Sequence, residues 1–224
     1  MSRRLLALPL LLLGFAAFTA NADEPMAPPN ALPVEWSKAL NWRSIGPANM
    51  AGRVTALAVF EPDPTCYYVA TASGGLLKTI NNGITLEHLF DKESTVSIGA
   101  VAVSQTDKNL VWVGTGEANP RNSVSQGDGV YKSTNGGKSW THVGLKGTYQ
   151  IGQIVLHPTD PDTVYVAALG RLYGPNDDRG VFKTTDGGQS WAKVLSVDDR
   201  TGAIDLVMQP TNPDVLIAGM WERK

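Results

Sequence analysis

The 224-residue sequence predicts an all-β fold made of four-stranded antiparallel sheets that repeat along the chain. Two observations support this prediction. Short apolar runs, rich in β-branched and aromatic residues, alternate with segments containing Pro, Gly, Asn and Asp, which is typical of strands joined by tight turns. An eight-residue segment also occurs twice, as STNGGKSW at 133–140 and as TTDGGQSW at 184–191. Self-similarity at a fixed period indicates a repeat architecture.

The N-terminus has the pattern of a secretory signal peptide at 1–22. Two arginines at 3–4 precede an apolar run at 5–17, and a small-residue cleavage site, Ala-Asn-Ala, occupies 20–22. The apolar run is too short to span a membrane. We therefore expect a secreted or periplasmic protein with no membrane span after cleavage. A Pro-rich leader at 23–41 precedes the repeats.

Each repeat starts with two predicted strands separated by a polar turn, and this pair occurs four times. Third and fourth strands follow in the first three repeats, so the repeats cover about 52–90, 97–144 and 150–195, with the start of a fourth at 201–224. Four antiparallel strands per unit, repeated radially, are typical of a β-propeller blade. We therefore expect about three and a half blades within 42–224. Glycines begin the repeats: Gly52, Gly99, Gly152 and Gly202.

The half blade has a consequence for assembly, because a propeller closes its ring so that every blade has two neighbours. Apolar residues of the fourth repeat would otherwise be exposed, and exposed apolar faces favour association. We therefore expect 23–224 to be a fragment of a longer propeller, or to need another copy to close the ring. The residues expected to be exposed are Ile204, Leu206, Leu216 and Ile217.

The two octets join the third and fourth strands of their blades. Each contains Asn-Gly or Asp-Gly, a strong hairpin signal because the tight turn needs positive φ at its central residues. The hydroxyl and the Asn or Asp side chain can bond the amides of the turn, and the tryptophan can anchor the outgoing strand. A degraded copy, TINNGITL at 79–86, has Leu86 in place of tryptophan. We expect structural roles for Ser133, Asn135, Gly137, Trp140, Thr184, Asp186, Gly188 and Trp191.

The octets resemble the Asp-box, or BNR repeat, written roughly S/T-x-D-x-G-x-x-W. This repeat occurs in sialidases, xyloglucanase-like glycoside hydrolases, sortilin-type receptor propellers and photosystem II assembly-factor-like proteins. The entry WRSIGPANMAGRV at 42–54, with VATASGG, VWVGTGE and GDGVYKSTNGG, is most similar to exported bacterial propellers of the sortilin-like or glycosyl-hydrolase-like type. The resemblance covers roughly 40–224 and implies a β-propeller. It does not by itself define an activity, because one fold hosts many functions.

The resemblance also allows two catalytic sets to be compared with this chain. Xyloglucanase-like enzymes carry an aspartate just before a Gly-Gly in the first blade, where this chain has Ala72 and Ser73. Sialidases have a Phe/Tyr-Arg-Ile-Pro motif, from which WRSIGP at 42–47 departs. Because no complete catalytic set is visible, we favour an exported module that binds or scaffolds a protein or glycan. The alternatives are a glycoside hydrolase or an assembly-factor-like propeller.

Two long loops between second and third strands, at 116–129 and 170–180, are the predicted location of a site, because binding residues concentrate on loops held by a rigid scaffold. A glycosidase needs two carboxylates at the scissile bond, for which Glu117 and Asp128 are the candidates. The candidate ligand-binding residues are Arg53, Glu117, Asn119, Arg121, Arg171, Tyr173 and Asp177.

Other ligand classes find no support in the composition. A formal net charge of −2 does not favour nucleic acid as a partner. The three histidines are isolated from one another and Cys66 is the single cysteine, so we expect no metal site, no cofactor and no internal disulfide.

Overall fold

A computed structural model describes residues 52–119 and 123–223. The predicted signal peptide, the leader and the start of the 42–54 motif lie outside these ranges. Within them, the single helix is the short 3₁₀ helix η1 (Lys146–Thr148), and no helix is long and apolar enough to cross a membrane.

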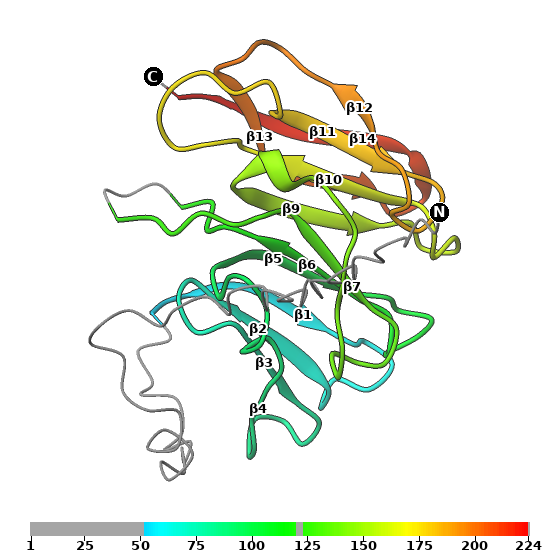
Figure 1. Cartoon of the computed structure of the whole chain (residues 1–224). Coiled ribbons are helices and arrows are strands. Elements are labelled where there is room, and N and C mark those ends of the chain that lie inside the picture. Colours follow the sequence, from blue (N-terminus) through cyan, green and yellow to red (C-terminus); the bar gives the residue numbers. More distant parts are fainter. Residues whose placement is uncertain (1–51, 120–122, 224) are drawn as a thin grey trace, which may run out of the picture. The chain divides into compact units, whose positions relative to one another are not determined.

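The described residues form three sheets of four strands and one sheet of two, as the sequence predicts. Strands pair in chain order, and every pair is antiparallel. Figure 1 shows the sheets following one another from cyan to red. Blade one contains β1 (Val54–Val59), β2 (Tyr67–Thr71), β3 (Leu76–Thr79) and β4 (Glu87–His88). Blade two contains β5 (Ile98–Val103), β6 (Val111–Thr115), β7 (Val130–Ser133) and β8 (Thr141–His142). Blade three contains β9 (Ile151–Leu156), β10 (Val164–Ala168), β11 (Gly180–Thr184) and β12 (Ala192–Leu195), and blade four contains β13 (Thr201–Gln209) and β14 (Asn212–Glu222).

The hydrophobic cores lie between neighbouring blades. Tyr68 and Phe90 pack with residues of blade two, and Trp112 packs in a second cluster shared by blades two and three. A third cluster joins Tyr165 of blade three to Leu206 of blade four. Strands between two cores are covered on both faces, which explains why β6 and β10 are buried at every residue.

Glycines on the inner strands allow neighbouring blades to approach closely. A Cβ on Gly99 would overlap the carbonyl oxygen of Ile151, and a Cβ on Gly152 would overlap that of Ile204. In blade one, the strand register does not place Gly52 at the position that Gly99 has in blade two. Val59 pairs with Tyr67 as Val103 pairs with Val111, so Thr55 is the counterpart of Gly99, and Gly52 precedes the strand. The Thr55 hydroxyl donates to the Ile98 carbonyl at 2.8 Å, so a hydrogen bond joins blade one to blade two here.

The prediction that apolar residues of blade four are exposed was wrong for two residues. Leu206 is only 3 % exposed, and Leu216 packs with it against blade three. Successive residues of a strand face opposite sides, so their neighbours Val207 and Ile217 point away, at 58 % and 73 % exposure. The exposure predicted for Ile217 is therefore confirmed.

Candidate functional site

Hydrogen bonds define two faces of the blade array. On one face, Gly187 of the third-blade octet donates to the Asp162 carbonyl in the turn after β9, at 3.0 Å. On the other, Gly127 donates to the Tyr149 carbonyl at 2.7 Å, and Leu169 donates to the Gln150 carbonyl at 2.9 Å. The long loops therefore meet the segments between blades, on the face opposite the octets. We call the face that carries the octets the octet face, and the opposite face, which carries the long loops, the loop face.

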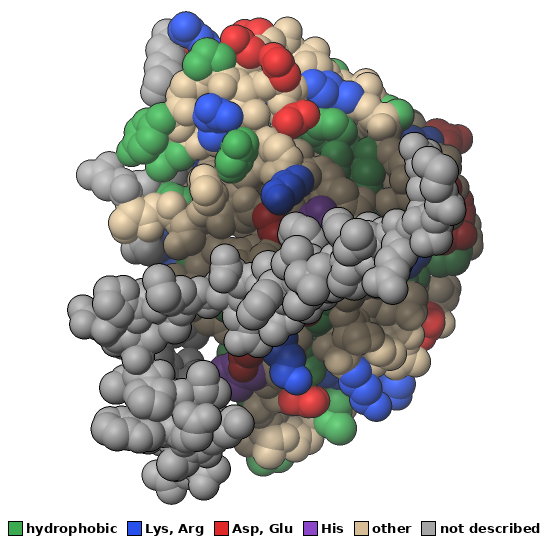
Figure 2. Space-filling view, viewed as in Figure 1, with side chains coloured by type: hydrophobic (Ala, Val, Ile, Leu, Met, Phe, Trp, Pro, Cys, Tyr) green, Lys and Arg blue, Asp and Glu red, His purple; other side chains and the backbone are tan. Residues whose placement is uncertain are grey.

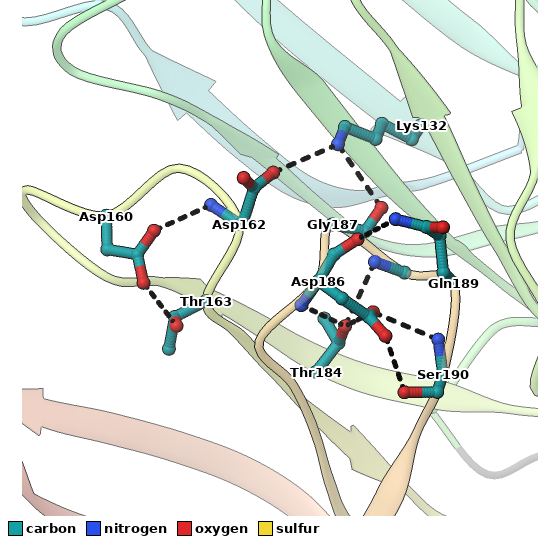
Figure 3. Close-up of polar contacts among 10 residues, drawn as sticks. Lys132, Asp160, Asp162, Thr163, Thr184, Asp186, Gly187, Gln189 and Ser190 are labelled. Carbon is teal, nitrogen blue, oxygen red and sulfur yellow. Dashed lines mark hydrogen bonds and ion pairs between the residues drawn. The ribbon is translucent and has the colours of Figure 1, made fainter.

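The octet of blade three is bonded to itself (Figure 3). Asp186 accepts from the Ser190 hydroxyl at 2.6 Å, the Ser190 amide at 2.9 Å and the Thr184 hydroxyl at 2.7 Å. The Gly188 amide donates to the Thr184 oxygen at 2.9 Å. The bonds from Ser190, with the one from Thr184, hold the pKa of the Asp186 carboxyl well below its usual range. These contacts support a structural role, because the carboxylate is occupied by its own turn.

The octet tryptophans connect their blade to the preceding one. The Trp191 indole donates to the Val143 carbonyl at 2.6 Å, and the Trp140 indole donates to the Leu89 carbonyl at 2.8 Å. In the degraded octet of blade one, Asn81 still accepts from the Thr85 amide at 2.9 Å. Leu86, in the tryptophan position, is 48 % exposed. The turn and the inter-blade anchor are thus separable parts of the motif.

The octet of blade two has the same internal bonds. The Ser133 hydroxyl donates to Asn135 at 2.9 Å, and the Gly137 amide donates to the Ser133 oxygen at 2.8 Å. Asn135 also accepts from the Ser139 amide at 3.0 Å. An amide side chain therefore forms the same turn as the aspartate of blade three.

The candidate carboxylates Glu117 and Asp128 each have their own partners. Glu117 is 1 % exposed and forms an ion pair with Arg53, which directly precedes β1. Asp128 accepts from the Tyr131 hydroxyl at 2.8 Å and from the Ser94 hydroxyl. Burial is the main cause that raises the pKa of Tyr131 to about 12. The structure thus joins the predicted residues Arg53 and Glu117 to each other, while the Asp128 carboxylate is bound by hydroxyl groups.

A groove of about 420 Å³ lies between the two long loops, and we call it the loop-face groove. The Arg171 guanidinium lies 5.1 Å from the centroid of the Tyr149 ring and donates to the Tyr149 hydroxyl at 3.4 Å. Tyr173 is 65 % exposed. The groove therefore presents aromatic, cationic and amide groups together. It is lined by Val124, Gln126, Tyr149, Gln150, Arg171, Leu172 and Tyr173.

The backbone at Tyr149 is strained. Its φ is 53° and its ψ is −38°, a positive-φ combination that bulky residues rarely adopt. The hydrogen bond from Gly127 fixes the carbonyl of this residue, and a Cβ on Gly116 would overlap the same carbonyl. Strained residues of this kind cluster at binding and active sites. The strain therefore coincides with the wall of the groove.

Two buried arginines hold Gln150, which lines the loop-face groove, and the loop at 170–180 in place. Arg223 donates to the Gln150 side chain and to the Ala118 carbonyl, the latter at 2.9 Å. Burial, with the nearby charge of Arg179, lowers the pKa of Arg223 to about 10. Arg179 is fully buried and donates to the carbonyls of Arg171 at 2.8 Å and Gly174 at 3.0 Å. The positions of the loop at 170–180 and of Gln150 therefore depend on these guanidinium groups.

Apart from Arg53 and Glu117, which pair with each other, the predicted ligand-binding residues fall into three groups. Arg171 and Tyr173 line the loop-face groove. Asn119 and Asp177 are exposed but do not line it, and the Asp177 carbonyl accepts from Lys193. Arg121 lies outside the described residues.

Sequence reasoning missed Tyr149, Gln150 and Arg223 because none of them is in a long loop. A signal existed for one of them: Gln150 directly precedes the inner strand β9, the place that Arg53 occupies before β1.

Neither the charges on the face seen in Figure 2 nor the metal-ligating side chains of the described residues indicate a second site. Lys/Arg and Asp/Glu side chains are interspersed on the described surface visible in Figure 2. In residues 52–119 and 123–223, no group of three His, Cys, Asp or Glu side chains has the arrangement of a metal site. Cys66 is buried and has a free thiol.

Comparisons with known proteins agree with this architecture. The family model "Sortilin, neurotensin receptor 3" matches residues 128–224. An ancestral GH74 enzyme has 24% sequence identity and a TM-score of 0.60, and the match covers 79% of this chain and 23% of that chain. The Niastella koreensis GH74 enzyme has 21% identity and a TM-score of 0.53, with 71% and 25% coverage. The GH74 xyloglucanase from Xanthomonas campestris has 16% identity and a TM-score of 0.51, with 75% and 29% coverage.

The chain spans about a quarter of the length of these GH74 structures. A search of curated proteins finds no match. The similarity confirms the β-propeller fold, and with the family match it confirms the resemblance to sortilin-like Asp-box propellers.

Proposed function

We propose that this chain is an exported β-propeller module that binds a protein segment or a glycan in the loop-face groove. The observation that carries the proposal is the combination of the stacked Arg171–Tyr149 pair with the exposed ring of Tyr173. Tyrosines supply rigid amphipathic contact area at low entropic cost. Guanidinium and amide groups can bond the hydroxyls of a sugar or the backbone of an extended peptide. Export is included because of the signal-peptide pattern at 1–22.

The carboxylates favour binding over glycoside hydrolysis. A glycosidase needs one protonated and one ionised carboxyl group flanking the scissile bond. Glu117 is only 1 % exposed and is ion-paired with Arg53, so its carboxylate already has a partner within the blades. Asp128 accepts bonds from three hydroxyls, those of Ser94, Thr115 and Tyr131. Neither carboxylate lines the loop-face groove, and none of its described lining residues is an aspartate or glutamate.

A binding panel tests the proposal. Xyloglucan oligosaccharides, other neutral oligosaccharides and extended peptides would be presented to the full chain and to Tyr173→Ala and Arg171→Ala. We expect at least one class to bind, with at least about tenfold weaker binding by both variants and little change in melting temperature, because Tyr173 is exposed. Ile84→Ala is the matched control, since Ile84 is 83 % exposed on the octet turn of blade one.

Equal binding by the parent and both groove variants would contradict the proposal. Turnover of an oligosaccharide that Glu117→Gln abolishes would instead establish a glycoside hydrolase.

A further inference from the structure

Tyr149 occupies a position of the repeat that blade one fills with glycine. Arg53 before β1 and Gln150 before β9 each accept a backbone hydrogen bond from the residue that follows the second strand of their blade, at 3.0 and 2.9 Å. Gly52 and Tyr149, one residue earlier, are therefore equivalent, and their φ angles are 71° and 53°. Glycine adopts positive φ without the steric cost that a Cβ brings. The chain thus keeps a large side chain where the backbone favours glycine.

Hydrogen bonds hold the backbone of Tyr149 in this conformation. The Gln150 amide donates to the Thr148 carbonyl at 2.5 Å, so Tyr149 is the central residue of a γ-turn with positive φ, the rare and strained form. From the loop at 116–129, Gly127 donates to the Tyr149 carbonyl at 2.7 Å. Strained backbone persists only where the surrounding structure fixes it. The loop at 116–129 therefore helps to fix the backbone that carries the tyrosine ring.

The Tyr149 ring contacts the other long loop through Arg171. The guanidinium lies 5.1 Å from the ring centroid and donates to the tyrosine hydroxyl at 3.4 Å. The backbone of Arg171 is held separately, because its carbonyl accepts from Arg179 at 2.8 Å. Among the described residues, only Tyr149 bonds the Arg171 side chain. The orientation of that guanidinium therefore depends on the tyrosine ring.

The charges around Arg171 make this contact important. Burial is the main cause that lowers the pKa of Arg179, and the nearby charge of Arg171 lowers it further, so the two guanidinium groups repel each other. The described residues that line the loop-face groove include no carboxylate that could attract Arg171. An aromatic ring attracts a guanidinium through its quadrupole. The contact with Tyr149 thus opposes the repulsion and keeps Arg171 at the groove.

We propose that Tyr149 is the positioning residue of the loop-face groove, holding the Arg171 guanidinium in the orientation in which it meets the ligand. The inference rests on the binding function proposed above. A guanidinium has several N–H donors, and among the described residues it donates only to the Tyr149 hydroxyl, so its other donors are available to oxygen atoms of a ligand. Glycine would form the same turn without strain, as in blade one. The chain therefore gives up stability to position Arg171, a trade that is common at functional sites.

Melting temperatures test the strain. Tyr149→Gly and Tyr149→Ala both remove the ring, and only glycine relieves the positive φ. Tyr149→Gly should therefore melt at least about 2 °C above Tyr149→Ala. The matched control is Tyr173, an exposed groove residue without positive φ, where the glycine variant should melt no higher than the alanine variant. Equal melting of Tyr149→Gly and Tyr149→Ala would overturn the proposal.

Chemical labelling tests the positioning without a ligand. Phenylglyoxal reacts with accessible guanidinium groups, and mass spectrometry of the digested chain measures the labelling of each arginine. Arg171 should be labelled faster in Tyr149→Gly than in the parent, because the ring no longer covers it. The exposed Arg200 is the internal reference and should react equally in both. Equal labelling of Arg171 in the two proteins would overturn the proposal.

Calorimetric titration with the xyloglucan oligosaccharides and extended peptides of the panel tests the link to binding. Tyr149→Gly should weaken binding of the strongest binder at least about tenfold. The same change should have little further effect in an Arg171→Ala background, because residues that act together are not additive. Equal weakening in both backgrounds would show that Tyr149 does not act through Arg171.

The matched control for binding is Asn82→Gly. Asn82 has a φ of 58° in the first octet, so glycine there relieves a positive φ on the octet face and should leave affinity unchanged. If no member of the panel binds the parent, the proposed function fails. The melting and labelling results then still decide whether Tyr149 positions Arg171.

Discussion

Replacing Trp191 by alanine should destabilise the chain much more than the same truncation at the equivalent position of blade one. The Trp191 ring packs edge-on against Trp112, with 6.3 Å between centroids, and its indole donates to Val143 at 2.6 Å. Truncation of a buried aromatic residue costs ~3–5 kcal/mol. Trp191 is only partly buried, so we expect about 3 kcal/mol, of which the hydrogen bond accounts for about 1 kcal/mol.

Urea denaturation followed by circular dichroism measures this free energy directly. Leu86→Ala is the matched control, because Leu86 is 48 % exposed and its truncation should cost less than about 0.5 kcal/mol. Trp191→Phe should cost about 1 kcal/mol, since the ring contact is retained while the bond to Val143 is lost. If Trp191→Ala cost no more than Leu86→Ala, the inter-blade anchoring role of the octet tryptophan would be refuted.

Three further predictions concern the turn, the inner strands and a buried hydroxyl. The pKa of Asp186 is depressed in the folded state, so the carboxylate's contribution to stability is present above its usual pKa and lost as pH falls below about 4. In urea denaturation, the stability advantage of the parent over Asp186→Asn should therefore shrink over that range. A difference that stays constant with pH would contradict this prediction. Gly152→Ala should lower the free energy of unfolding by ~1–3 kcal/mol, because the added Cβ meets the Ile204 carbonyl. Gly219→Ala is the control and should be near neutral, since the nearest atom to its Cβ lies at 3.6 Å. Equal denaturation midpoints for the two variants would count against close contact between the blades. The pKa of Tyr131 is raised to about 12, so the contribution of its hydroxyl to stability is present below about pH 10 and lost as pH rises through about 12. Tyr131→Phe should remove this part of the loss of stability at alkaline pH. If stability falls with rising pH in the same way in the variant and the parent, burial of the hydroxyl has no such effect.

The blades were predictable because their signals are local. Strands covered on both faces are continuously apolar, and each turn carries its own Gly, Asn, Asp or Pro. Register and facing were not predictable in the same way. Thr55, not Gly52, takes the place of the repeat glycine, because the pairing with β2 sets the position of β1. Leu206 rather than Val207 faces blade three, because the contact between blades decides which face of the strand is covered.

The site was predicted only where it lies on long loops. Loop length singled out Arg171 and Tyr173, which line the groove. Tyr149 and Gln150 come from the short segment between blades two and three, and only the stacking of blades brings them to the same groove. Glu117 was predicted as a site carboxylate on its loop, but it is 1 % exposed and its partner Arg53 comes from another blade. Contacts between residues far apart in the sequence leave no local pattern.

The central claim is that the loop face binds a ligand while the octets are structural. Hydrogen–deuterium exchange of the full chain, with and without the strongest binder from the glycan and peptide panel, tests it most directly. We predict slower exchange on binding at 124–127, 149–150 and 171–173, and unchanged exchange at 184–191. Slower exchange at the octets with no change in the groove would contradict the claim.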